Sequence, residues 1–228
     1  EDYKAFSVLE EMLTTGRGYQ SILGLERKDY VARMHEDAQW AHDFTHMLYY
    51  HHQPEARALA NSLDLRGYHR VLDVGGGSGV MSMALARKHR HLKATVLDIE
   101  PVIRVTQKII RREKLSARID TLVGDMNERL PDGYDVIMFC DTSHYSPELF
   151  NRAYNSLPDG GMVVLVDTFF SEDWSGALYR LMWQLRSTGL WLEKRSQIVD
   201  RLKNVGFKAA SSRRIHGDIW MITGRKRA

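Results

Sequence analysis

Residues 71–79 read VLDVGGGSG, a short apolar run that passes into a turn made almost entirely of glycine. A helical period follows at once, with Val80, Met83 and Ala84 on its apolar side. Glycine in such a turn lets the backbone approach a ligand closely, because a Cβ atom would occupy the space that the ligand needs. A buried strand, a glycine turn and a helix in this order indicate a loop that binds a ligand.

The spacing of the glycines and a downstream acid define the kind of ligand. A nicotinamide-dinucleotide fold requires G-x-G-x-x-G, and Val80 stands where its third glycine belongs. Gly75, Gly77 and Gly79 match G-x-G-x-G instead. Asp98 ends the next apolar run, nineteen residues after Gly79, where a carboxylate can accept both hydroxyls of a ribose. We therefore expect a nucleoside-type cofactor at the carboxyl ends of the strands; the alternative is a tight turn that binds nothing.

Strand-like and helical segments alternate from residue 70 onward. The strand-like segments are near-continuously apolar, as expected for strands buried on both faces, and they occur at 71–74, 94–97, 119–123, 136–139 and 162–166. This alternation predicts an α/β fold with a doubly wound parallel sheet. After residue 170 we expect helices at about 172–187 and 195–205, then strands at about 207–214 and 218–223. Gly217 lies between these two strands and predicts an antiparallel pair.

The front of the chain has a different pattern. Residues 1 to about 65 are typical of helices and loops, with few helix breakers between 26 and 52 and with Pro54 placed to open a further helix. We therefore predict two parts, a helical linker and substrate cap over 1–65 and a cofactor-binding catalytic domain over 66–228.

Composition excludes several classes of protein. The chain has 228 residues, 43% of them hydrophobic, which is enough for a buried core, and no apolar run approaches the roughly 20 residues that span a bilayer. A net charge of +3 gives no argument for a nucleic-acid partner. The single cysteine, Cys140, excludes an internal disulfide and a Cys-based zinc cluster. It favours a reducing compartment, and we expect the protein in the cytoplasm.

Two segments resemble the class I S-adenosylmethionine (SAM) methyltransferases, DVGGGSG at 73–79 and LDIEPVI at 97–103. More narrowly, the chain resembles the small-molecule O-methyltransferases of the caffeate and acetylserotonin type. The family's Gly-Asp-Met block stands here as Gly124, Asp125 and Met126, although one residue is inserted before Pro101. The resemblance implies a Rossmann-like, seven-stranded sheet with an antiparallel last strand, and SAM as the cofactor.

The resemblance also assigns residues to the cofactor. It implies that Asp73 and the glycines hold the amino-acid end of SAM, and that Asp98 binds the ribose. It places Asp125 and Met126 around the adenine. Cys140 replaces a family lysine, so only a backbone contact is expected there. The predicted cofactor-binding residues are Asp73, Gly75, Gly76, Gly77, Asp98, Ile99, Asp125, Met126 and Cys140.

A histidine is the candidate catalytic base. In the family, a histidine base follows by nine residues the aspartate that begins the fourth strand, and Asp135 and His144 have this spacing. Imidazole, with a pKa near 6.5, suits the removal of a phenol proton at neutral pH. The Asp and Trp that follow the family histidine are absent here. The alternatives for His144 are a cap for a helix near Pro147 and a substrate contact without proton transfer.

A base histidine needs a carboxylate that orients it. Asp167 stands at the end of the fifth strand, where the resembling family has a glutamate beside the base, so we predict that Asp167 orients His144. A second family glutamate corresponds, with a shifted spacing, to Glu193. Asp141 is a further candidate by position alone.

A histidine pair on the front segment offers another kind of site. His42 and His46 lie one helical turn apart, a spacing that can place two imidazoles on one metal ion. No third ligand at a fixed spacing is visible, so we predict no metal. We expect this helix to line the substrate mouth or to carry a solvated surface.

These observations predict a SAM-dependent O-methyltransferase, an enzyme of EC 2.1.1 type, that methylates a hydroxyl of a small aromatic molecule. One alternative is C- or N-methylation on the same fold, with His144 holding the substrate or, together with Asp141, a metal. Another is a SAM-binding module without turnover. Neither nucleic acid nor membrane is an expected partner.

The resembling family also implies an assembly. Its members carry an N-terminal dimerisation domain, so we expect a homodimer through a domain absent from this chain. Tyr30, Trp40 and Phe44 should then be more exposed than a monomer tolerates. The alternative is a short, monomeric methyltransferase.

Overall fold

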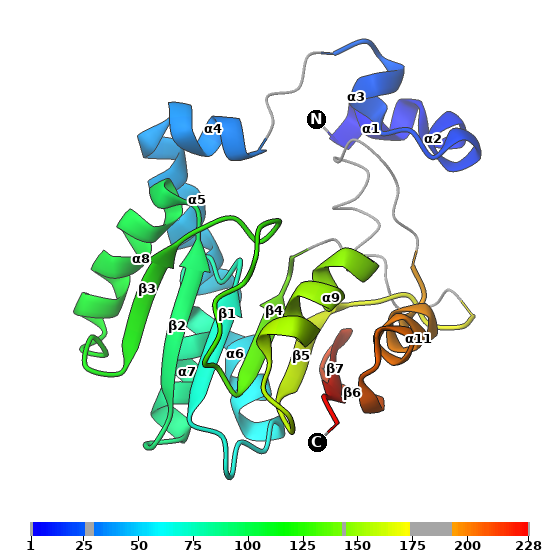
Figure 1. The fold of residues 1–228 in the computed structure, drawn as a ribbon. Coiled ribbons are helices and arrows are strands. Elements are labelled where there is room, and N and C mark those ends of the chain that lie inside the picture. The colour runs from blue at the N-terminus through cyan, green and yellow to red at the C-terminus, as the bar shows by residue number, and fades with distance from the viewer. Residues whose placement is uncertain (1, 26–29, 143–144, 174–192, 228) are drawn as a thin grey trace.

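The computed structural model describes residues 2–25, 30–142, 145–173 and 193–227. These residues build a seven-stranded sheet in the order β3-β2-β1-β4-β5-β7-β6 (Figure 1). The strands are β1 (Arg70–Val74), β2 (Lys93–Asp98), β3 (Ile119–Val123), β4 (Val136–Cys140), β5 (Met162–Thr168), β6 (Lys208–His216) and β7 (Ile219–Arg225). Strands β1 to β5 are parallel, and β7 runs antiparallel to both β5 and β6. The predicted doubly wound α/β sheet with an antiparallel last strand is confirmed.

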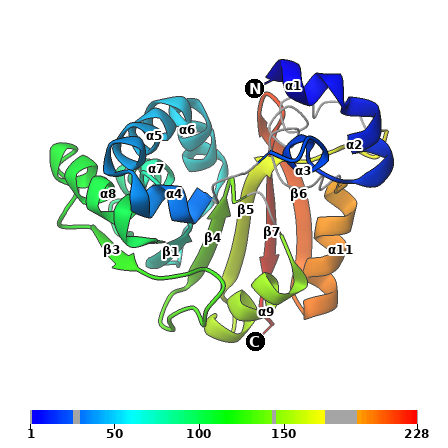
Figure 2. The same cartoon turned by 90° about the horizontal axis from the view of Figure 1, so that it is seen from above.

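Helices cover both faces of the sheet (Figure 2). Helices α5 (Ala38–His51), α6 (Gln53–Ser62), α7 (Val80–Lys88) and α8 (Glu100–Arg112) lie on one side. Helices α9 (Pro147–Ser156) and α11 (Arg195–Val205) lie on the other. The four short N-terminal helices, visible at the top of Figure 1, are α1 (Asp2–Ser7), α2 (Leu9–Thr15), α3 (Tyr19–Ile22) and α4 (Tyr30–Glu36).

Alternation along the central strands creates two cores. Val71 packs into the cluster that contains Leu59 of α6 and Met83 of α7. Its neighbour Leu72 packs into the cluster of the opposite face, with Phe150 of α9. Successive side chains of a strand point to opposite faces, so a run of apolar residues is needed where both faces are covered. The apolar runs of the sequence are explained in this way.

The glycine turn between β1 and α7 depends on glycine for two separate reasons. At Gly76 an added Cβ would lie 2.6 Å from the Cγ atom of Asp73, so no side chain fits. Gly79, the residue before α7, has φ +74°, a left-handed conformation that other residues rarely adopt. An added Cβ at Gly79 would also lie 3.2 Å from a methyl group of Val96. The turn therefore brings bare backbone to the carboxyl end of the sheet.

Two expectations need correction. Strand β3 was expected to be buried on both faces, but it is the edge strand, and Leu122 and Val123 are 38% and 54% exposed. The segment 26–52 was expected to be helical with few breaks, but Asp37 ends one helix and begins the next. Its carboxylate accepts the Trp40 N–H at 2.9 Å and so caps α5. Most of the helix expected at 172–187 lies outside the described residues.

The boundary predicted at residue 65 is not tested, but the packing of α6 bears on it. Leu59 and Leu63 belong to the same core cluster as Val71 of β1, so α6 is part of the layer that covers the sheet. Helices α1 to α3 enclose a small cluster of their own, around Met12 and Tyr19. None of the helices in the described ranges has the length and apolar character needed to cross a bilayer.

Replacing Gly79 by alanine tests the turn. Gly79→Ala and Gly160→Ala both force alanine into a left-handed conformation, at a cost of about 1 kcal/mol each. Only Gly79→Ala adds a close contact, because nothing lies within 4 Å of an added Cβ at Gly160. We expect urea unfolding to show a loss of about 2–3 kcal/mol for Gly79→Ala and about 1 kcal/mol for Gly160→Ala. Equal losses would contradict the packing argument.

Candidate functional site

Four aspartates lie at the carboxyl ends of four neighbouring strands. Asp73 is on β1, Asp98 ends β2, Asp141 follows β4 and Asp167 is on β5. Their charges influence common neighbours. Burial raises the pKa of the Cys140 thiol, and the charges of Asp73, Asp167 and Asp141 raise it further. The strand order thus gathers carboxylates that the sequence keeps far apart.

Asp73 is fully buried at the foot of the glycine turn. Its Oδ2 atom accepts the Ser82 hydroxyl at 2.7 Å, whereas its Oδ1 atom has no hydrogen-bond partner among the described residues. Burial raises the pKa of Asp73 to about 6, and the charge of Asp98 adds to this effect against the hydrogen bonds from Ser82. A buried carboxylate with a free oxygen is suited to receive a cationic or hydrogen-bonding ligand.

Asp98 joins β2 to the glycine turn. Its Oδ2 atom accepts the Gly77 N–H at 2.8 Å, and its Oδ1 atom accepts the Ile99 N–H at 2.8 Å. Burial raises the pKa of Asp98, while these two backbone bonds oppose the rise. On the other side of the turn, the buried hydroxyl of Thr106 donates to the Gly77 carbonyl at 2.5 Å. The turn and the strand-end acid are therefore held in one position relative to each other.

The remaining predicted cofactor residues lie around the same turn. An added Cβ at Gly75 would lie 3.3 Å from a methyl group of Thr142 and 4.0 Å from the sulfur of Met126. Asp125 is exposed, and its carboxylate accepts the Asn127 N–H at 2.8 Å. The Thr142 hydroxyl is buried without a partner in the described part of the chain. Free polar atoms beside bare backbone fit a nucleoside cofactor with an amino-acid tail.

Of the two predicted catalytic residues, His144 lies outside the described residues, and Asp167 is buried. Asp167 Oδ2 accepts the hydroxyl of Tyr145 at 2.8 Å, and Asp167 Oδ1 accepts the Thr168 N–H at 2.7 Å. Tyr145 directly follows His144 in the chain and is itself fully buried. Its bond to Asp167 fixes one end of the segment that carries the predicted base.

The two weaker carboxylate candidates have partners of their own. Glu193 forms an ion pair with Arg201, and Arg201 donates to the Tyr145 carbonyl at 2.9 Å. Asp141 forms an ion pair with His52, whose Nε2 atom lies 3.3 Å from Asp141 Oδ2. Both candidates therefore contact the surroundings of the segment between β4 and α9.

An aromatic cluster of α4 and α5 lies beside the aspartates. Trp40 and Phe44 stack with ring centroids 5.0 Å apart, and Tyr30 packs edge-on against both. Burial raises the pKa of Tyr30, and the charges of Asp98 and Asp141 raise it further. Tyr30 is 38% exposed, but Trp40 and Phe44 are half-buried against each other, contrary to the exposure expected for all three.

Four residues that contact or adjoin the aspartates are not among the predicted site residues: Tyr30, His52, Thr106 and Tyr145. Thr106 had a detectable signal, because it is a polar residue on the apolar face of α8. His52 had none, since its partner Asp141 is distant in sequence. Local spacing therefore indicated the glycine turn and Asp98, but not the residues that contact the turn, Asp141 and Asp167 from elsewhere in the chain.

The histidine pair of α5 lies at the surface. The rings of His42 and His46 are 4.2 Å apart, and His42 Nδ1 lies 3.0 Å from a carboxylate oxygen of Asp43. In the described ranges, no group of three or more His, Cys, Asp or Glu side chains is placed to hold a metal ion.

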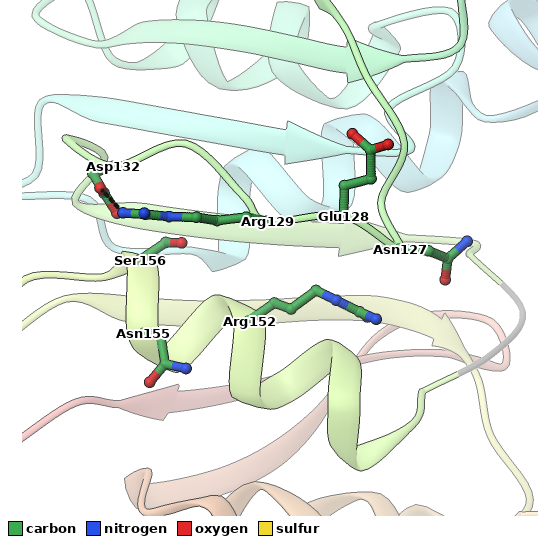
Figure 3. Close-up of a pocket in the computed structure, with 7 residues that line it drawn as sticks. All are labelled: Asn127, Glu128, Arg129, Asp132, Arg152, Asn155 and Ser156. Atoms are coloured by element: carbon green, nitrogen blue, oxygen red, sulfur yellow. Dashed lines mark hydrogen bonds and ion pairs between the residues drawn. The ribbon is translucent and has the colours of Figure 1, made fainter.

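A surface pocket of about 470 Å³ lies between the loop before β4 and α9 (Figure 3). Arg129 forms an ion pair with Asp132 on one side of it, and Arg152 extends from α9 toward Asn127. None of the predicted catalytic or cofactor residues lines this pocket. A neighbouring pocket of about 360 Å³ is lined by Asp125, by Leu97 of β2 and by Leu122 of β3, among others.

Comparison with known proteins identifies relatives. A family model described as an O-methyltransferase domain matches residues 6–201. The chain is 34% identical over 167 residues to an L-tyrosine C(3)-methyltransferase of Streptomyces lavendulae, which covers 68% of this chain and 46% of that protein. It is 36% identical over 127 residues to a 3-hydroxy-5-methyl-1-naphthoate 3-O-methyltransferase of Streptomyces sahachiroi, which covers 53% and 37%. The matches span less than half the length of these two curated relatives.

The fold has solved counterparts. The crystal structure of human N-acetylserotonin methyltransferase in complex with SAM superposes with a TM-score of 0.83. The match covers 99% of this chain and 67% of that chain, at 20% sequence identity. At this identity the likeness establishes the fold alone.

The raised pKa of Asp73 predicts how stability depends on pH. Because the folded protein holds this proton up to pH of about 6, its free energy of unfolding should fall as pH rises from about 4 through 6. Asp73→Asn keeps an acceptor for Ser82 but cannot ionise. We expect this variant, free of ligand, to be more stable than wild type by about 1–3 kcal/mol at pH 7, with the difference disappearing near pH 4.

Thermal unfolding between pH 4 and 8 measures this difference. Asp120→Asn, at an exposed aspartate of β3, is the control and should show no such pH dependence. A stability difference between Asp73→Asn and wild type that does not change with pH, or that has the opposite sign, would contradict a raised pKa of Asp73.

Proposed function

Because the chain belongs to the O-methyltransferase domain family, we propose that it is a SAM-dependent methyltransferase of a small molecule. One observation carries the cofactor assignment, the hydrogen bond from the Gly77 N–H to the Asp98 carboxylate. It joins the two sequence motifs of a nucleoside site, the glycine turn and the strand-end acid, in one structure. A fold counterpart whose structure contains SAM supports the same cofactor.

In this proposal different residues bind different parts of the cofactor. Asp98 accepts the ribose hydroxyls, and the unpartnered Oδ1 atom of Asp73 faces the amino-acid end. Asp125 and Met126 flank the adenine. SAM supplies an electrophilic methyl group on a sulfonium. The protein mainly has to hold the acceptor oxygen in line with that group and to exclude water.

We assign the acceptor as a hydroxyl of a small aromatic molecule. The description of the family supports oxygen as the acceptor atom, and a relative named for 3-hydroxy-5-methyl-1-naphthoate supports an aromatic ring. The Tyr30, Trp40 and Phe44 cluster beside the aspartates offers flat apolar surface. His144 removes the hydroxyl proton, and buried Asp167 orients the imidazole.

Methylation at carbon is the second candidate, because the relative with 34% identity is named an L-tyrosine C(3)-methyltransferase. Deprotonation of a phenol also activates its ring carbons, so the same base serves both reactions. Incubation with SAM and each of 3-hydroxy-5-methyl-1-naphthoate, L-tyrosine and N-acetylserotonin, followed by NMR of the product, distinguishes an O-methyl from a C-methyl group.

A cytoplasmic location and a homodimeric assembly complete the proposal. The buried, unpaired Cys140 supports a reducing compartment. Exposed apolar side chains on α1 and α2, such as Tyr3 and Leu13, support a contact with a second copy.

Asp98→Ala tests the cofactor site. Loss of a charged ribose contact should weaken S-adenosylhomocysteine binding by about 1.5–3 kcal/mol, about 10- to 150-fold, as measured by calorimetry. Asp218→Ala, which removes an exposed aspartate paired with Arg214, is the control and should bind as wild type does. Unchanged affinity in Asp98→Ala would refute the assignment.

His144→Ala tests the base. Turnover of a phenolic acceptor at pH 7 should fall about 10²-fold or more, because proton removal typically contributes 10²–10⁴ in rate. S-adenosylhomocysteine affinity should not change. A near-normal rate would exclude His144 as the base. A large loss of S-adenosylhomocysteine affinity would instead indicate that His144 contributes to the cofactor site.

A further inference from the structure

An ion pair connects helices α5 and α6 to the carboxyl end of the sheet, where the four aspartates lie. His52 lies between α5 and α6, and its Nε2 atom is 3.3 Å from Asp141 Oδ2. The His52 side chain is only 14% exposed, whereas that of Asp141 is 47% exposed. Asp141 is anchored to the sheet, because its N–H donates to the Val166 carbonyl at 2.9 Å. The ion pair therefore joins the layer of α5 and α6 to the residue that directly follows β4.

The backbone of Asp141 has an unusual conformation. Its φ is +53°, in the left-handed region that residues other than glycine rarely adopt, although aspartate tolerates it better than most. A residue in such a conformation persists only where surrounding contacts hold it. The contacts of Asp141 therefore stabilise the backbone conformation at this position.

His52 is surrounded by carboxylates. Asp141 after β4, Glu55 on α6 and Asp167 on β5 all act on its charge, and the ring of His51 meets it edge-on at 4.9 Å. Burial alone lowers the pKa of His52, but the hydrogen bond and the charge of Asp141, with those of Glu55 and Asp167, outweigh it. The net effect raises the pKa. Protonated His52 therefore offsets part of the negative charge of Asp141, Glu55 and Asp167.

We propose that His52 is a positioning residue whose ion pair with Asp141 ties the beginning of the segment between β4 and α9 to helices α5 and α6. His144 follows Asp141 by three residues in this segment. His52 and Asp141 hold its beginning, and the bond from Tyr145 to Asp167 holds the part that leads into α9. The consequence for catalysis rests on the proposed function, because it requires that His144 acts on the acceptor.

The ion pair affects the segment rather than the cofactor contacts. Asp98 is held by Gly77 and Ile99, neither of which contacts His52 in any described interaction. Loss of the ion pair should therefore leave cofactor affinity intact and lower the rate of the chemical step, which is sensitive to small misplacements of reacting groups.

Amide hydrogen exchange of the full chain, followed by mass spectrometry, tests the proposal without an acceptor. His52→Gln removes the charge, Asp141→Asn removes its partner and His52→Arg keeps a charged donor. We expect exchange of the amides of Asp141, Thr142, Tyr145 and Ser146 to rise at least 5-fold at pH 6 in the first two variants and to return toward wild type in His52→Arg. Arg66→Gln, which breaks an exposed ion pair with Asp64, is the control and should leave these amides unchanged.

The pH dependence separates positioning by charge from a general packing role. Since the folded-state pKa of His52 is raised, the ion pair should be fully present below about pH 6.5 and lost as pH rises through the folded value. After correction for the intrinsic exchange rate, wild type should match His52→Gln at pH 9 but not at pH 6. A difference that persists at pH 9, or exchange unchanged by His52→Gln at pH 6, would overturn the proposal.

Steady-state kinetics with whichever of the three acceptors is methylated then measures the effect on catalysis. His52→Gln should lower kcat about 10-fold, with acceptor KM and S-adenosylhomocysteine affinity within 2-fold of wild type. An unchanged kcat would overturn the catalytic consequence. If no acceptor is methylated, or if His144→Ala keeps full activity, the proposed function fails while the exchange results still decide the role of His52.

Discussion

The rest of the site depends on one constraint: four aspartate side chains are gathered at the carboxyl ends of neighbouring parallel strands. The order β2-β1-β4-β5 places Asp98, Asp73, Asp141 and Asp167 at adjacent strand ends. Burial disfavours the charged form of a carboxylate, and a neighbouring carboxylate disfavours it further. Burial and the charge of Asp98 raise the pKa of Asp73, and burial raises the pKa of Asp98. Ionised aspartates at these positions therefore need hydrogen-bond donors, a nearby cation, or a ligand that provides both.

The donors are divided between two halves of the site. On the β1 and β2 side, backbone N–H groups of the turn and the hydroxyl of Ser82 hold Asp98 and Asp73, and one oxygen of Asp73 stays free. On the β4 and β5 side, His52 holds Asp141 and Tyr145 holds Asp167. The first half contains the residues predicted to bind the cofactor, and the second half contacts the segment that precedes α9. In the proposed function, the first half binds the cofactor and the second half positions the acceptor.

What could be predicted from the sequence was what is encoded locally. The glycine turn and Asp98 were found because strand, turn and helix follow one another within residues 71–98, and the structure brings them together through Gly77. The edge position of β3 was missed, because apolar composition does not reveal strand order. The contact between His52 and Asp141 was missed because it joins elements distant in sequence. The spacing that selects His144 remains a prediction.

Asp73, at the carboxyl end of β1, is partly protonated near pH 6 in the free protein, and we propose that binding of a cationic cofactor favours its ionised form. Calorimetric titration of SAM at pH 6, in buffers of different ionisation enthalpy, tests it most directly. Asp73 is about half protonated there, and an incoming cation should lower its pKa. The account predicts that SAM binding releases a fraction of a proton in wild type and clearly less in Asp73→Asn. Binding heats that do not depend on the buffer, or equal release in both proteins, would contradict it.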